Sequence, residues 1–130
     1  MLKVIHVITD MKIGGAGRWL LNFLKNYDRK QLALKVVVPK GSMLKAEVEA
    51  LGIAVIEIPG IGDKSLDFAS IQAFYGLFKK EKPEIVHTHA SLSARFAARG
   101  AGVKAIVHTK HCIDRPKTGL EKTVAAIINN

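Results

Sequence analysis

Short, continuously apolar runs alternate with longer segments of helical periodicity along most of the chain, and this alternation limits the fold to few choices. Apolar runs without polar interruption are typical of parallel strands that are buried on both faces. The strands are predicted at residues 2–9, 33–38, 53–58, 84–88 and 104–109. Right-handed crossovers favour the strand order 3-2-1-4-5, so we expect a Rossmann-like three-layer α/β/α domain with a five-stranded parallel sheet.

Helices are predicted between these strands, with apolar residues at the spacing of one helix face. They cover about 15–27, 42–51, 66–81 and 91–101. Ser42 is a candidate N-cap, and Gly52 a candidate left-handed cap. The third helix is expected to turn Ile71, Phe74, Tyr75 and Phe78 inward. A capping box at Thr118-Gly119-Leu120-Glu121 opens one more predicted helix, and residues 1–130 are predicted as one domain.

Composition favours a folded protein of the cytoplasm. The chain has 130 residues, 48% of them hydrophobic, and no segment approaches the ~20 apolar residues of a membrane helix. The single cysteine excludes an internal disulfide, and no signal pattern is visible at Met1-Leu2-Lys3. We expect a cytoplasmic location, with peripheral contact at the inner face of the membrane as an option.

A net charge of +9 admits several partners. A solubilising surface, a phosphorylated substrate and an anionic membrane surface all fit this charge. Nucleic acid is not expected, because aromatic residues make up only 6% of the chain and do not interleave with the basic ones.

A glycine loop follows the first predicted strand, at Gly14-Gly15-Ala16-Gly17. A turn from a parallel strand into a helix presents free backbone N–H groups, and glycine lets an anion come close. The spacing matches neither the dinucleotide fingerprint nor a Walker loop. A tight turn without a ligand is the alternative interpretation. Arg18 opposes the helix dipole at this end, which an anion bound beside it would explain.

Histidines follow or end two later strands. His89 and His111 are predicted at the carboxyl edge of the sheet, beside the glycine loop, where open α/β sheets bind ligands. His6, His87 and His108 lie inside strands and are interpreted as core residues. A zinc site built from His87, His89, His108 and His111 is a minor alternative, and we expect no metal.

These motifs in series resemble the N-terminal domain of the family 4 glycosyltransferases, which are retaining enzymes of the two-Rossmann (GT-B) architecture. The similarity rests on Val4-Ile5-His6-Val7-Ile8-Thr9 with Gly14-Gly15-Ala16, on Lys82-Pro83-Glu84-Ile85-Val86-His87-Thr88-His89, and on Val107-His108-Thr109-Lys110-His111. The order and spacing agree over almost the whole chain.

The resemblance implies roles for single residues. Gly14 and Gly15 match the loop that approaches the donor diphosphate, and His111 matches a catalytic histidine near the transferred sugar. His89 matches the acceptor side of the cleft. The implied substrate-binding set is Gly14, Gly15, Ala16, Arg18, Thr88 and His89, without metal or cofactor. Gly17 departs from the pattern, because the family often has glutamate there.

The resemblance also implies a second, donor-binding domain, which we expect to be absent from this sequence. The chain would then be the acceptor-binding half of a transferase that uses a nucleotide-diphosphate sugar, inactive alone and prone to self-association. Two alternatives stay open. One is a stand-alone binding or regulatory module for a phosphorylated metabolite, and the other is half of an enzyme like the sugar-nucleotide 2-epimerases.

Overall fold

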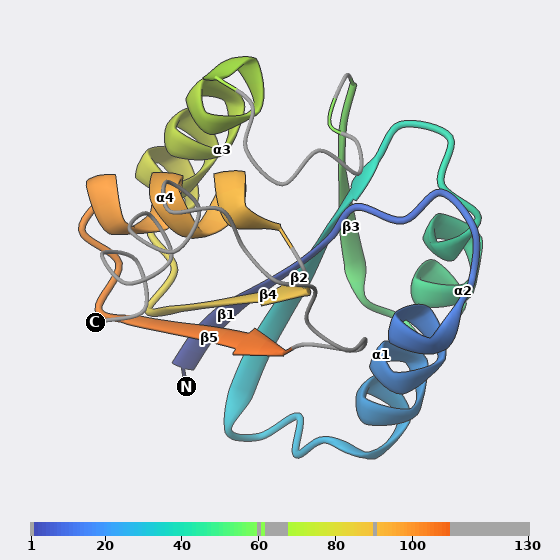
Figure 1. Cartoon of the computed structure of the whole chain (residues 1–130). Coiled ribbons are helices and arrows are strands. Elements are labelled where there is room, and N and C mark those ends of the chain that lie inside the picture. Colours follow the sequence, from blue (N-terminus) through green and yellow to red (C-terminus); the bar gives the residue numbers. More distant parts are fainter. Residues whose placement is uncertain (1, 60, 62–67, 90, 110–130) are drawn as a thin grey trace.

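The computed structural model describes residues 2–59, 61, 68–89 and 91–109. Its strands, rich in buried aliphatic residues, form one parallel sheet (Figure 1). The strand order is β3-β2-β1-β4-β5 and every pairing is parallel, which confirms the predicted Rossmann-like fold. The strands are β1 (Leu2–Ile8), β2 (Leu32–Pro39), β3 (Ala54–Ile58), β4 (Ile85–His89) and β5 (Ala105–Thr109).

Helices cover both faces of this sheet. Figure 1 places α1 and α2 on one side and α3 and α4 on the other. Their bounds are α1 (Gly15–Asn26), α2 (Leu44–Ala50), α3 (Phe68–Glu81) and α4 (Leu92–Gly100). These agree with the predicted ranges to within about two residues wherever the chain is described. The helix predicted to open at residue 118 lies outside the described residues. None of the described helices has the length and apolar character needed to cross a bilayer.

Gly52 marks a helix boundary as predicted from the sequence, whereas the N-cap of α2 is Met43 and not the predicted Ser42, which lies one residue earlier. Gly52 follows α2 with φ of +79°, a backbone conformation that glycine adopts without a Cβ penalty. At the other end of α2, Ser42 Oγ accepts a hydrogen bond from Leu44 N at 3.3 Å and donates to the Asp10 carbonyl at 2.9 Å. Ser42 thus ties the start of α2 to the chain just after β1.

Side-chain alternation on β1 divides the core into two layers. Val4 and Ile8 pack with α1 and α2, whereas Ile5 and Val7 pack with α3 and α4. The second layer contains Phe74 and Phe78, the large buried residues of α3. Tyr75 was predicted to face inward, but it is 42% exposed. Tyr75 lies about 100° around the helix from Phe74, at the margin of the face that packs in this layer, and the layer buries Phe74 and Phe78 but not Tyr75.

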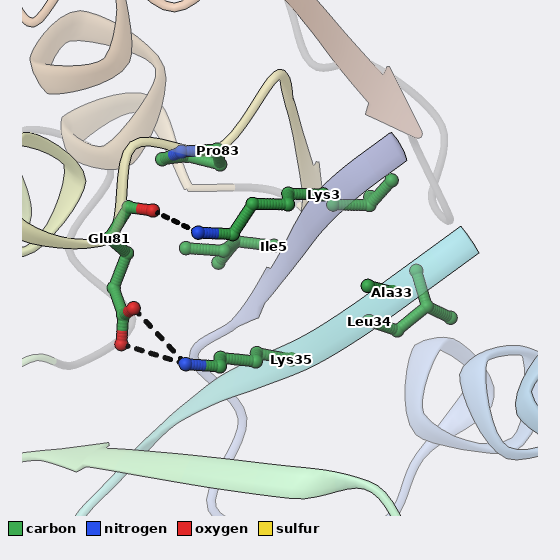
Figure 2. A pocket seen from close by; sticks show the side chains of 8 residues that line it. Lys3, Ile5, Ala33, Leu34, Lys35, Glu81 and Pro83 are labelled. Carbon is green, nitrogen blue, oxygen red and sulfur yellow. Dashed lines mark hydrogen bonds and ion pairs between the residues drawn. The ribbon is translucent and has the colours of Figure 1, made fainter. Parts of the chain in front are cut away.

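The end of α3 contacts the sheet at the amino-terminal ends of its strands, where Glu81 lines a small cavity of about 70 Å³ (Figure 2). Glu81 pairs with Lys35 of β2 at 3.0 Å, and its carbonyl accepts a hydrogen bond from Lys3 Nζ at 2.9 Å. The Lys35 side chain is 40% exposed, so this ion pair contributes at most about 1 kcal/mol. The cavity therefore lies at the edge opposite to the strand ends where a ligand is expected.

Two phenylalanines of α3 provide a test of the α3/α4 layer. Phe74 is fully buried, so Phe74→Ala should lower the free energy of unfolding by about 3–5 kcal/mol. Phe68 is 73% exposed, and Phe68→Ala should change it by no more than about 0.5 kcal/mol. Urea unfolding followed by circular dichroism measures both. Equal losses in the two variants would contradict the layer arrangement.

Candidate functional site

The point where the strand order reverses lies between β1 and β4. β1 is followed in the chain by β2 on one side, whereas β4 lies on its other side. Ile8, the last residue of β1, is the register partner of His89, the last residue of β4. Ligands of open α/β sheets bind outside the carboxyl ends of the strands at such a reversal, so the residues that follow Ile8 and His89 define the candidate site.

The glycine loop enters α1 at this point with its backbone exposed. Gly14 is the N-cap in an extended conformation, with φ of −103°, and no side chain caps the helix. A Cβ atom added to Gly14 or Gly15 would meet nothing within 4 Å, and neither residue has a positive φ. Internal packing and backbone strain therefore do not explain the two glycines. Both residues are exposed and no side chain caps the first-turn N–H groups, which suits an anion.

Gly17 has a different role, because it is buried against the start of α2. A Cβ at this position would lie 3.2 Å from Leu44 Cδ2 and 3.4 Å from Ile13 Cγ2. Any residue with a Cβ here would require fully buried Leu44 to shift by a few tenths of an ångström. A residue without a Cβ at position 17 therefore suits the close approach of α1 to Leu44.

Three histidines meet on the α1 side of the sheet. His6 Nδ1 lies 3.3 Å from His89 Nε2, and the His87 ring stacks on the His89 ring at 4.6 Å with an interplanar angle of 9°. His6 and His89 are 1% and 2% exposed, and His87 is half-buried. The sequence interpretation treated His6 and His87 as separate core residues and missed this cluster. The His-x-His spacing in β4 was the available signal, because residues i and i+2 of a strand share a face.

Aromatic residues of α1 pack against the three histidines, and burial lowers the pKa of one of these histidines. Trp19 lies 5.3 Å from the His89 ring and 5.7 Å from the His87 ring, and Phe23 lies 5.3 Å from the His6 ring. Burial, with a smaller contribution from His87, lowers the pKa of His6 from 6.5 to about 3. His6 is therefore neutral at physiological pH.

The alternative zinc set proposed from the sequence is split between the two faces. His108 Nδ1 lies 3.0 Å from Thr88 Oγ1, on the side of α3 and α4, whereas His87 and His89 face α1. His111 lies outside the described residues. The four histidines of that set therefore do not form one site.

The predicted substrate-binding residues differ in exposure. Gly14, Gly15 and Arg18 are exposed at the start of α1, and Ala16 is half-buried against the α1 layer. Thr88 and His89 are buried and make the contacts described above. Because the predicted catalytic His111 falls outside the described residues, its placement beside Gly15 stays a prediction.

The lowered pKa of His6 predicts a loss of stability in acid. The unfolded chain takes up a proton near pH 6.5, whereas folded His6 resists protonation until about pH 3. Stability from this group is complete above pH 6.5 and falls as pH drops through that window, by about 2 kcal/mol between pH 7 and 5. His87 and His89 are the titratable side chains whose rings contact the His6 ring.

His6→Asn should remove this acid sensitivity, since asparagine keeps a polar atom near the position of Nδ1 but does not titrate. Thermal unfolding of both proteins at pH 5 and pH 7, in buffer with EDTA so that no metal competes for the imidazoles, measures the difference. Parallel pH profiles for the two proteins would show that His6 is not the group responsible.

Known proteins share both the sequence pattern and the fold. Over 48 residues the chain is 52% identical to the Escherichia coli UDP-Gal:alpha-D-GlcNAc-diphosphoundecaprenol alpha-1,3-galactosyltransferase, a match that covers 35% of this chain and 12% of that protein. A glycosyltransferase from Rickettsia africae superposes with a TM-score of 0.76 at 18% identity, over 98% of this chain and 34% of its own.

A UDP-GlcNAc 2-epimerase from Neisseria meningitidis, solved with UDP-GlcNAc, superposes with a TM-score of 0.63 at 14% identity, over 98% of this chain and 38% of its own. At such identities the two structures show the fold alone, and the chain spans little more than a third of either. The model of Glycosyltransferase Family 4 matches residues 13–129. The chain therefore belongs to glycosyltransferase family 4.

Proposed function

We propose that this chain is the acceptor-binding half of an enzyme that transfers a sugar, with retention, from a nucleotide-diphosphate donor to an acceptor. The observation that carries the proposal is the open backbone at Gly14 and Gly15, on the helix that starts at the switch point. Family membership supports the reaction class, and the loop geometry supports the diphosphate as the group that approaches it.

The charge at this end of α1 suits a departing diphosphate. The first turn of α1 holds no acidic side chain, and Arg18 is exposed one turn into the helix. Among the described residues, no carboxylate forms an ion pair with Arg18. The N–H groups and the guanidinium together would stabilise negative charge that develops on the leaving diphosphate, without a metal ion.

His111 is proposed as the catalytic residue beside the transferred sugar, and His89 as part of the acceptor side. Both roles rest on the family resemblance. The remainder of the donor site would come from a second domain, so positioning of the donor by this domain alone would be incomplete.

A second candidate is half of a sugar-nucleotide 2-epimerase-like enzyme. The likeness to the Neisseria epimerase supports it, although that likeness extends to the fold alone. A product assay separates the two: transfer joins the sugar to an acceptor, whereas epimerisation inverts one carbon of the nucleotide sugar.

Gly15 provides the sharpest test of the loop. In an enzyme that contains both domains, Gly15→Ala should lower kcat/KM for the donor roughly 10-fold or more, and Gly15→Val should lower it further. The Gly15→Ala variant should nevertheless be as stable as the parent or up to about 1 kcal/mol more stable, because alanine favours the helix and has room.

Gly76 of α3 is the matched control, because it is also an exposed helical glycine where an added Cβ would enter open space. Gly76→Ala should increase stability without changing the kinetics. Full activity in the Gly15→Val variant would show that the diphosphate does not approach this loop.

The 130-residue chain alone should not transfer sugar. Orienting the reactants contributes about 7–11 kcal/mol to catalysis of this kind, and the positioning groups of the proposed second domain would be missing from the assay. Incubation with common UDP-, GDP- and ADP-sugars and analysis of released nucleotide by chromatography tests this. Turnover above that of a buffer blank would contradict the assignment of the chain as a half-enzyme.

A further inference from the structure

The three-histidine cluster joins the two strands that flank the switch point. His6 belongs to β1, whereas His87 and His89 belong to β4, and His6 and His87 are register partners. Each of the three offers one ring nitrogen, and these nitrogens all lie within 4.8 Å of one another. His6 and His89 are within hydrogen-bond distance of each other, but that bond does not account for a third imidazole nitrogen at the same point.

The closest pair already has the spacing of two ligands on one metal ion. His6 Nδ1 and His89 Nε2 are 3.3 Å apart. Two nitrogens on a tetrahedral zinc ion, each at about 2.0–2.1 Å from it, are about 3.3–3.4 Å apart. A ring nitrogen of His87 lies within 4.8 Å of the two ligand nitrogens of this pair, so His87 provides the third nitrogen of the face.

The chemistry of the cluster selects the type of metal. All three ligands are imidazoles, and no carboxylate of the described residues belongs to the group. Imidazole suits zinc, copper and nickel, whereas magnesium, calcium and manganese prefer oxygen ligands. Three protein ligands also leave the fourth tetrahedral position for water.

The surroundings hold the rings in place for such a role. Thr109 Oγ1 of β5 lies 2.5 Å from His87 Nε2. When His87 donates its Nε2 proton to this hydroxyl, its Nδ1 carries the lone pair, as an outer-shell partner arranges in metal sites. Trp19 and Phe23 cover the cluster from α1 with apolar surface, and half-buried His87 is the member most accessible to an incoming ion.

We propose that His6, His87 and His89 form a zinc-binding site that ties β1 to β4 beneath the glycine loop, with water as the fourth ligand. This site goes beyond the proposed transfer reaction, which uses no metal. A zinc ion there braces the two strands whose ends form the walls of the donor crevice.

Trp19 allows a direct test, because it is the only tryptophan of the chain and its ring lies 5.3 Å from that of His89. The EDTA-treated 130-residue chain is titrated with ZnCl2 and with CoCl2, and Trp19 fluorescence and thermal unfolding are recorded. We expect one ion per chain, a rise in melting temperature with zinc, quenching by cobalt, and no response to MgCl2. No binding, or an equal response to MgCl2, would overturn the site.

Variants locate the ion. His6→Asn and His89→Asn each remove a ligand, so the dissociation constant for zinc should rise beyond the roughly 10–100-fold that loss of an outer-shell partner costs. His108→Asn is the matched control, since His108 lies in the neighbouring strand but faces α3 and α4. Unchanged affinity in His6→Asn, or an equal loss in His108→Asn, would overturn the proposal.

Two measurements remain decisive if the ligand variants fail to fold. Thr109→Val retains all three ligands and should weaken zinc binding about 10-fold by removing the partner of His87. The absorption spectrum of the cobalt-loaded parent chain should show visible bands of a four-coordinate ion without a thiolate charge-transfer band. Such a thiolate band would place the metal at Cys112 instead, and unchanged zinc affinity in Thr109→Val would likewise contradict the site.

Discussion

The pairing of β1 with β2 on one side and β4 on the other fixes where the described candidate residues at the strand ends lie. Because both pairings are parallel, the ends of β1 and β4 come together at one edge, with Ile8 opposite His89. The pleat of the same strands then decides the face. His89 turns toward α1 and Thr88 turns toward α4, so two neighbours in the sequence serve different sides of the sheet.

The fold could be predicted from the sequence because its signals are local. Strands buried on both faces produce uninterrupted apolar runs such as Val36 to Val38, and the turn residues between elements are visible directly, as at Gly52. Tyr75 shows the limit of this reasoning, since helical periodicity indicates which side of a helix is buried but not how wide the buried face is. Only packing against α4 decides that Phe74 and Phe78 fill the core while Tyr75 remains exposed.

The site was predictable only in part, for a physical reason. The glycine loop is a local motif, but the sequence does not distinguish glycines that leave room for a ligand from one that leaves room for a neighbour. Gly14 and Gly15 border open space, whereas Gly17 borders Leu44 of another helix. The His-x-His spacing in β4 is a local signal for two members of the histidine cluster, but the third depends on lateral register between strands, which brings His6 to His89 across 83 residues of chain.

The histidine cluster and the glycine loop affect the same strand end in opposite ways: the cluster lowers stability in acid, whereas the loop needs a rigid support. A buried imidazole such as that of His6 is held neutral, at the cost of stability in acid, and natural cores usually place aliphatic residues in such positions. A loop that binds a diphosphate instead needs a rigid base, because its N–H groups stabilise charge only if they are fixed before the reaction. A divalent ion shared by β1 and β4 reconciles the two demands, since it uses neutral imidazoles as ligands and stiffens the strands that carry the loop.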